Sequence, residues 1–136
     1  MPISEQYEIV VADDDTDDQY LIREAIQQSG IKHNVTAVYN GLQLLDLLRC
    51  KGIYKDAEPR RPDLIILDLN MPVLEGSAAL ENIKSDQSLK DIPVYILSTS
   101  THSVDIEKCK NLGANQFYPK PYQFGKLKAI IEDMIS

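Results

Sequence analysis

The chain has 136 residues with 43% apolar and 26% charged side chains, which suits one globular domain with a hydrophobic core. Its net charge is −7 and it has no basic stripe to meet phosphates, which argues against direct nucleic-acid binding. No apolar stretch approaches membrane-spanning length and no signal peptide precedes the first apolar run, so we expect a cytoplasmic protein without membrane insertion.

The first predicted strand and the first predicted helix enclose a dense cluster of aspartates. Residues 7–12 form a short β-branched apolar run that is typical of a buried strand. Apolar residues at helical spacing begin near Tyr20 and end before Ser29-Gly30, where the glycine is a plausible helix stop. Residues 13–18 lie between them and contain five aspartates. The cluster therefore occupies a turn from strand to helix.

This cluster has more than one possible role. A calcium loop is disfavoured for two reasons. Its sixth position requires glycine, but the residue at that position is Asp18, and a calcium loop follows a helix, whereas this cluster follows a predicted strand. Two interpretations of the aspartate cluster remain, a binding site for a cation and the solvated start of a helix. Helix capping explains Asp17 and Asp18 well, since acidic side chains favour a helix N-terminus. It explains Asp13 and Asp14 less well, because they directly follow the strand.

Strand and helix signals continue to alternate along the chain. The run of residues 63–68 is the most hydrophobic and predicts a central strand that is covered on both faces. The other predicted elements are a strand near 35–38, a helix opening at Asn40-Gly41, a polar loop at about 51–62, a helix at 78–85, a strand at 93–98, a helix at 104–112, a strand at 115–118 and a last helix from about Phe124. Five strands alternating with five helices predict an α/β fold with a parallel sheet covered on both faces.

In such folds ligands bind beyond the carboxyl ends of the strands. The residues at those ends are Asp13, Asp14, Asp68, Ser98 and Lys120. Three close carboxylates repel each other unless a cation intervenes, and an oxygen-lined site with room for water and phosphate suits Mg²⁺. A lysine and a hydroxyl suit phosphoryl oxygens. Asp68 ends the most buried strand and is the best-placed nucleophile, because a carboxylate can attack phosphorus to give an acyl phosphate.

Four segments at these strand ends resemble the receiver domain of a two-component response regulator, over almost the whole chain. They are VVADDD, LIILDLNMPVLEG, PVYILSTS and FYPKP, and Ser98 and Lys120 follow Asp68 by 30 and 52 residues, as in the family. The resemblance implies a flavodoxin-like (βα)5 fold, a doubly wound parallel sheet with strand order 2-1-3-4-5. Residues 1–136 are expected to form a single receiver without an output domain. The long loop before the third strand resembles a subgroup paired with phytochrome-type and other sensor histidine kinases.

The resemblance also implies roles for the residues at the strand ends. Asp68 would be the phosphoacceptor. In the Mg²⁺ site, Asp14 would be a direct ligand beside Asp68, Asp13 would hold a metal-bound water, and Asn70 would offer its backbone carbonyl. Lys120 would pair with the phosphoryl group, and its bond to the following proline would be cis.

Two further residues match the positions that change conformation on phosphorylation in the family. Ser98 matches the switch hydroxyl, which is more often threonine, and Phe117 matches the switch aromatic, which is frequently tyrosine. Without a phenolic hydroxyl, Phe117 lacks part of the usual signalling contact. Elsewhere, Asp15 is expected only to add acid near the site.

The expected function is therefore phosphorelay signal transduction. The expected partners are a sensor histidine kinase or a histidine phosphotransfer domain, together with a downstream protein target reached through the face of the fourth helix, fifth strand and fifth helix, which could also form a homodimer. One alternative is a phosphatase of the haloacid dehalogenase type, but Asn70 stands where that family has a second acid. Another is a degenerate receiver that serves as a scaffold, although every position needed for phosphorylation is filled.

Overall fold

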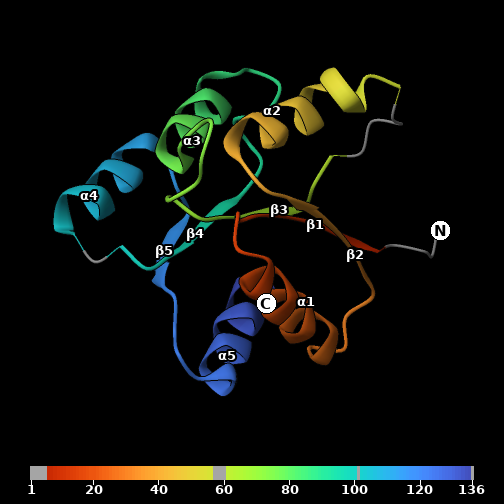
Figure 1. Ribbon diagram of the computed structural model, residues 1–136, viewed down its shortest axis with the longest axis vertical. Coiled ribbons are helices and arrows are strands. Elements are labelled where there is room, and N and C mark those ends of the chain that lie inside the picture. Colours follow the sequence, from red (N-terminus) through yellow and green to blue (C-terminus); the bar gives the residue numbers. More distant parts are fainter. Residues whose placement is uncertain (1–5, 57–60, 101, 136) are drawn as a thin grey trace.

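The computed structural model describes residues 6–56, 61–100 and 102–135, and its strands and helices alternate along the chain (Figure 1). The strands are β1 (Tyr7–Ala12), β2 (His33–Val38), β3 (Leu64–Leu67), β4 (Val94–Ser98) and β5 (Gln116–Pro119). The helices are α1 (Thr16–Gln28), α2 (Gly41–Arg49), α3 (Gly76–Ser85), α4 (Ser103–Leu112) and α5 (Phe124–Ile135). Within the predicted polar loop, a short 3-10 turn forms at Gly52–Tyr54, and residues 57–60 lie outside the described part.

The five strands form one parallel sheet in the order β2-β1-β3-β4-β5. This order confirms the flavodoxin-like arrangement expected from the sequence. β3 lies at the centre and all four of its residues are buried, because helices cover both faces of the sheet. Figure 1 shows α2, α3 and α4 on one face and α1 and α5 on the other. In the described residues, no helix is long and apolar enough to cross a membrane.

The sheet separates two apolar cores, since successive side chains of a strand point to opposite faces. In β1, Val10 and Ala12 belong to the core beneath α2, α3 and α4, whereas Ile9 and Val11 belong to the core beneath α1 and α5. β3 alternates in the same way. The central strands are thus held from both sides, and the loops that follow them start from fixed positions.

The start of α1 agrees with the expectation that Asp17 and Asp18 belong to a helix N-terminus, but neither of them is the capping residue. The capping residue is Asp15, whose backbone is extended and whose Oδ1 accepts hydrogen bonds from the backbone N–H groups of Asp17 (2.9 Å) and Asp18 (3.2 Å). Asp17 and Asp18 lie in the first turn instead, where their charge suits the helix N-terminus. Capping by Asp15 leaves the Asp18 side chain available for other contacts.

Candidate functional site

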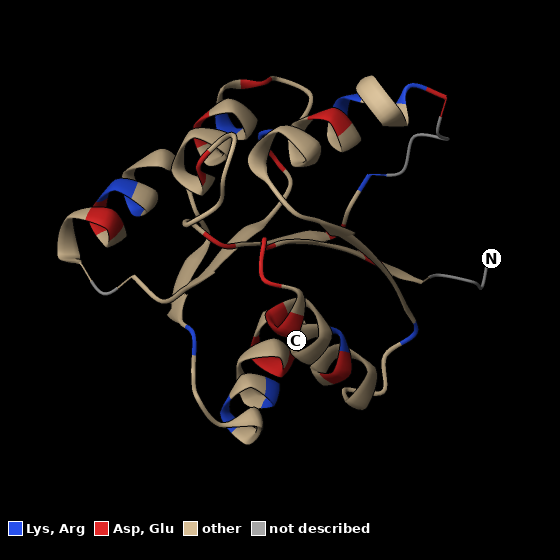
Figure 2. Ribbon diagram, in the orientation of Figure 1, with Lys and Arg blue, Asp and Glu red and all other residues tan. Residues whose placement is uncertain are grey.

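Backbone hydrogen bonds between strand ends bring the predicted site residues together at the edge of the sheet where the carboxyl ends of the strands lie. The N–H of Asp68 donates to the carbonyl of Ala12 at 2.9 Å, so the residue after β3 lies beside the end of β1. The N–H of Asp13 donates to the carbonyl of Val38 at 3.1 Å, at the end of β2. Figure 2 shows the acidic residues that follow β1 at this edge.

Lys120 reaches the same edge because it directly follows β5. The register pairs Pro119 with Ser98, so the residue after Pro119 continues the parallel ladder. The N–H of Lys120 donates to the Ser98 carbonyl at 2.9 Å. The bond between Lys120 and Pro121 is trans, so the expectation of a cis bond is wrong for this structure. Before proline the trans isomer is favoured by only about 0.5–1 kcal/mol, and a sequence resemblance therefore does not decide the isomer.

Three carboxylates meet at this edge. Asp13, Asp14 and Asp68 each offer an oxygen within 4.8 Å of the others, and Asp13 and Asp68 are buried while Asp14 is exposed. Burial raises the pKa of Asp13 to about 6, although Lys120 opposes the shift. Burial raises the pKa of Asp68 as well, again against the effect of Lys120. The site therefore concentrates negative charge where water cannot fully solvate it.

One oxygen of Asp68 has no partner. Its Oδ1 is buried and accepts no hydrogen bond from any of the described residues. Buried polar atoms are nearly always paired in proteins, so an unpaired carboxylate oxygen indicates a site for a cation or a reacting group. The ligand atoms that Asp13, Asp14 and Asp68 offer are carboxylate oxygens, which are the ligands that Mg²⁺ prefers. The residues present thus fit the expected metal.

The ammonium group of Lys120 lies among three carboxylates. Its Nζ is 2.8 Å from Oδ2 of Asp13, 2.8 Å from Oδ2 of Asp18 and 3.6 Å from Oδ2 of Asp68. Burial alone would lower the pKa of Lys120, but its hydrogen bonds to Asp13 and Asp18 outweigh burial and raise it. The lysine is therefore charged at neutral pH. The contact with Asp18 was not anticipated from the sequence.

Ser98 and Asn70 lie beside the Asp68 carboxyl, and hydrogen bonds from the Ser98 side chain and the Asn70 backbone oppose the rise of its pKa, whereas Phe117 lies outside this cluster. Ser98 is fully buried, and its hydroxyl accepts a hydrogen bond from the N–H of Ser100 at 3.3 Å. Asn70 is exposed, two residues after Asp68. Phe117 is half-buried in β5 and packs against the core beneath α2, α3 and α4.

Gln19 is a second residue whose role the sequence analysis missed. Its side chain is buried in α1, and its Nε2 lies within hydrogen-bonding distance of the carbonyls of Val11 (3.0 Å), Asp13 (3.0 Å) and Val38 (2.9 Å). These carbonyls belong to the end of β1, the loop after it and the end of β2. The side-chain amide of Gln19 therefore holds in place the backbone segment that carries the Asp13 carboxylate.

Gly76 allows the first residue of α3 to pack directly against the backbone of Asp68 and Leu69. A Cβ atom at this position would lie 2.1 Å from the carbonyl oxygen of Asp68 and 2.7 Å from the Cα of Leu69. The N–H of Gly76 also donates to the carbonyl of Leu69 at 3.0 Å. Only glycine fits this approach, so α3 and the end of β3 hold each other in place.

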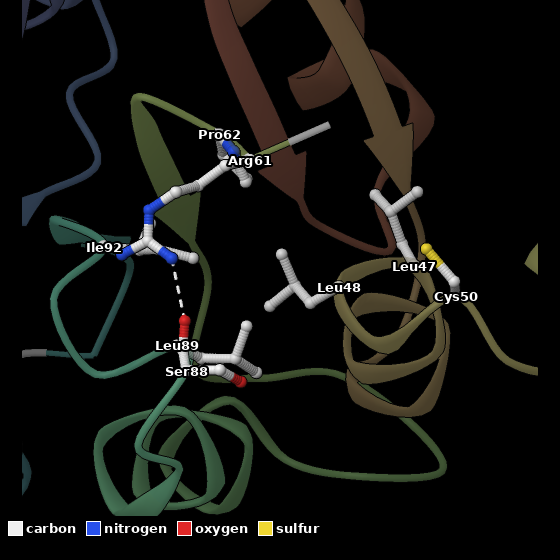
Figure 3. A pocket seen from close by; sticks show the side chains of 8 residues that line it. All are labelled: Leu47, Leu48, Cys50, Arg61, Pro62, Ser88, Leu89 and Ile92. Carbon is white, nitrogen blue, oxygen red and sulfur yellow. Dashed lines mark hydrogen bonds between the residues drawn. The ribbon is translucent and has the colours of Figure 1, made fainter. Parts of the chain in front are cut away.

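A separate pocket of about 320 Å³ lies near the amino ends of β3 and β4 (Figure 3). The guanidinium of Arg61 extends beside it and donates to the carbonyl of Ser88 at 2.7 Å. The pocket is lined by Leu47, Leu48, Cys50, Arg61, Pro62, Ser88, Leu89 and Ile92. These residues end α2 or precede β3 and β4, so the pocket is remote from Asp68.

Comparison with known proteins agrees with this geometry. The response regulator receiver domain model matches residues 9–132. The chain belongs to this family. It is therefore a receiver domain of two-component phosphorelay signalling, as the four sequence segments indicated.

Several similar proteins have been characterised. Response regulator Rcp1 of Synechocystis is 31% identical over 128 residues, which cover 94% of this chain and 86% of Rcp1. The crystal structure of the phosphorylated cyanobacterial phytochrome response regulator RcpA is similar with a TM-score of 0.87 and 37% identity, covering 96% of this chain and 91% of RcpA. The Mn²⁺-bound form of Rcp1 has a TM-score of 0.86 and 30% identity, covering 94% of this chain and 91% of that structure.

Proposed function

We propose that Asp68 accepts a phosphoryl group from a phosphohistidine of a sensor histidine kinase or a histidine phosphotransfer domain. The observation that carries this proposal is the buried, unpaired Oδ1 of Asp68, which shares the edge of the sheet with Lys120 and two further carboxylates. A carboxylate oxygen in this position is free to act as a nucleophile. A partner of the phytochrome type is supported by the similarity to RcpA, which is a phytochrome response regulator.

In the proposed step, Oδ1 of Asp68 forms a bond to phosphorus while the N–P bond of the donor breaks. The electron pair of that bond returns to the imidazole nitrogen, and the product is an acyl phosphate. The ammonium of Lys120 and the hydroxyl of Ser98 then donate hydrogen bonds to the phosphoryl oxygens. The chain acts only on its own aspartate, in phosphorylation and in dephosphorylation, and is in this sense no enzyme for an external substrate. The proposed location is the cytoplasm, where the kinase has access to ATP.

The proposed cofactor is Mg²⁺, with Asp14, Asp68 and the backbone carbonyl of Asn70 as direct ligands and Asp13 as a ligand through water. When bound, the ion neutralises part of the charge of the carboxylates and of the phosphoryl group. Support comes from the oxygen-only donor set and the high negative charge of the buried cluster. The similar protein Rcp1 has a solved form with Mn²⁺, a cation of the same charge.

For the output, we propose that the signal reaches a downstream protein, or a second copy of the chain, through the face formed by α4, β5 and α5. Two large apolar side chains are highly exposed near this face, Val104 at 75% and Tyr122 fully. Phe117 lies between this face and the core, so a change at Ser98 in the neighbouring strand can alter its packing. Its ring has no hydroxyl, and an inward position leaves no polar group unsatisfied.

Phosphorylation with a small phosphodonor tests the assignment of Asp68. Incubation with acetyl phosphate and Mg²⁺ should add one phosphoryl group, detected by intact mass, and hydroxylamine should remove it as expected of an acyl phosphate. Asp68→Asn should prevent the addition. A matched variant, Asp63→Asn, removes an aspartate at the other end of β3 and should label like the wild type. Labelling that persists in Asp68→Asn would identify a different acceptor.

A further inference from the structure

Asp18 is the only partner of Lys120 in the described residues that lies outside the predicted site. It is in the first turn of α1, 102 positions before Lys120, and their side chains meet at 2.8 Å. The contact is partly buried, since 13% of the Lys120 side chain and 33% of the Asp18 side chain are exposed to solvent. The sequence analysis gave Asp18 no role beyond the helix start.

We propose that Asp18 is a positioning residue that holds the Lys120 ammonium on the α1 side of the site and thereby limits phosphorylation of Asp68. This inference rests on the proposed function of Asp68. The supporting geometry is the difference between the contacts of Lys120, which is hydrogen-bonded to Asp18 and Asp13 at 2.8 Å but lies 3.6 Å from Asp68. At 3.6 Å the ammonium makes no hydrogen bond to the phosphoacceptor.

The backbone around Asp18 explains why its carboxylate stays near Lys120. The N–H of Asp18 donates to the capping side chain of Asp15 at 3.2 Å, and the next residue, Gln19, is buried with its Nε2 within hydrogen-bonding distance of three carbonyls. The first turn of α1 is therefore fixed on both sides of Asp18. A carboxylate held in this way competes for the ammonium at little cost in side-chain entropy.

The consequence for the reaction follows from the position of the ammonium. In the resting protein two of its three N–H donors are directed to Asp13 and Asp18, and its Nζ remains 3.6 Å from Oδ2 of Asp68. A phosphoryl group on Asp68 brings new oxygens, and the ammonium must shift toward Asp68 to bind them, which lengthens its contact with Asp18. Asp18 thus stabilises the unphosphorylated arrangement more than the phosphorylated one, and this difference lowers the extent of phosphorylation.

Two variants separate this contact from a general effect of charge. Asp18→Asn keeps the shape of the side chain but removes its charge. Asp17→Asn removes the same charge one residue earlier, and no contact between the Asp17 side chain and Lys120 occurs in the structure. Both residues lie in the first turn of α1, where Asp17 is exposed and Asp18 is partly exposed, so we expect both variants to fold.

The first measurement uses the metal-free, unphosphorylated protein. The ¹⁵N signal of the Lys120 ammonium should be visible in the wild type, because two carboxylates slow its hydrogen exchange. It should broaden or shift in Asp18→Asn and remain unchanged in Asp17→Asn. An unchanged Lys120 signal in Asp18→Asn would overturn the proposal, because Asp18 would then not hold the ammonium.

The second measurement is the rate of labelling by acetyl phosphate over a range of phosphodonor concentrations. Asp18→Asn should label several-fold faster at saturation, whereas Asp17→Asn should match the wild type. Equal rates in Asp18→Asn and the wild type would overturn the role of Asp18 while leaving the function of Asp68 intact. An equal acceleration in both variants would also overturn it, since the effect would then be one of net charge. Absence of labelling in the wild type would instead refute the proposed function, and the ammonium signal would still report on the contact.

Discussion

Replacement of Gly76 by alanine probes the contact between α3 and the phosphorylation site. The added methyl group would lie 2.1 Å from the Asp68 carbonyl oxygen, more than 1 Å short of the 3.4 Å at which ordinary contact begins. Its neighbours are backbone atoms of Asp68 and Leu69, which cannot rotate away as a flexible side chain can. The start of α3 must therefore move away from the end of β3.

The expected loss of stability follows from this clash. Overpacking a well-packed interior costs about 1–3 kcal/mol, and a clash with backbone atoms belongs near the upper end of that range, at about 3 kcal/mol. For a domain of this length each kcal/mol lowers the melting temperature by about 3–4 °C, so we expect a decrease of about 10 °C.

Urea unfolding followed by far-ultraviolet circular dichroism measures the change, with Gly125→Ala as the matched control. Gly125 also lies near the start of a helix, but a Cβ there would meet no atom within 4 Å. Alanine at that position should raise the free energy of unfolding by about 0.5–1 kcal/mol, because glycine is the poorer helix former. The two variants add the same methyl group and should shift stability in opposite directions. If Gly76→Ala were as stable as the wild type, α3 would not approach Asp68 as closely as described.

Three further predictions concern the site and the α5 side of the sheet. Gln19→Leu removes the two N–H donors that three carbonyls share, although the Val38 carbonyl keeps the N–H of Asp13, so it should cost about 1–3 kcal/mol in urea unfolding, and a loss below about 0.5 kcal/mol would contradict the role of the amide. Asp14→Asn should raise the melting temperature of the metal-free protein by relieving repulsion and should abolish the further rise caused by Mg²⁺; a retained Mg²⁺ response would rule out Asp14 as a ligand. Burial and a hydrogen bond to Asp133 raise the pKa of Tyr118 to about 12, so the stability that this phenol contributes should be complete below pH 10 and lost as the pH rises through about 12. An NMR titration that finds Tyr118 ionised at pH 10, or no decrease of its pKa in Asp133→Asn, would contradict this contact.

The sequence predicted the parts of this structure that depend on local patterns. Alternating apolar runs and helical spacing predicted the five strands and five α-helices of the described residues but not the 3-10 turn at Gly52–Tyr54. The positions of Asp13, Asp68 and Lys120 at strand ends predicted that they would meet. Gln19 also had a detectable signal, because it lies at helical spacing with Ile22 and Ile26 and is therefore a polar residue on the buried face of α1.

The contacts that were missed depend on distance or on small energy differences. The pairing of Asp18 with Lys120 joins residues 102 positions apart, and no periodic pattern connects them. The helix cap fell on Asp15 instead of its neighbours because any of several consecutive aspartates can cap a helix, and the backbone geometry of the turn decides between them. The isomer of the bond before Pro121 is likewise decided by tertiary context.

The short fifth strand has a consequence for how two copies of the chain could associate. β5 is an edge strand of four residues, and its last residue, Pro119, has no N–H. So short an edge offers few backbone groups to a strand from another molecule, and natural proteins use short edges and prolines to prevent a sheet from continuing into a neighbour. A dimer formed at this side of the molecule should therefore be held by side chains of α4 and α5, and the two sheets should remain separate. Reversible pairing of this kind allows subunits to exchange without unfolding, which a continuous intermolecular sheet would hinder.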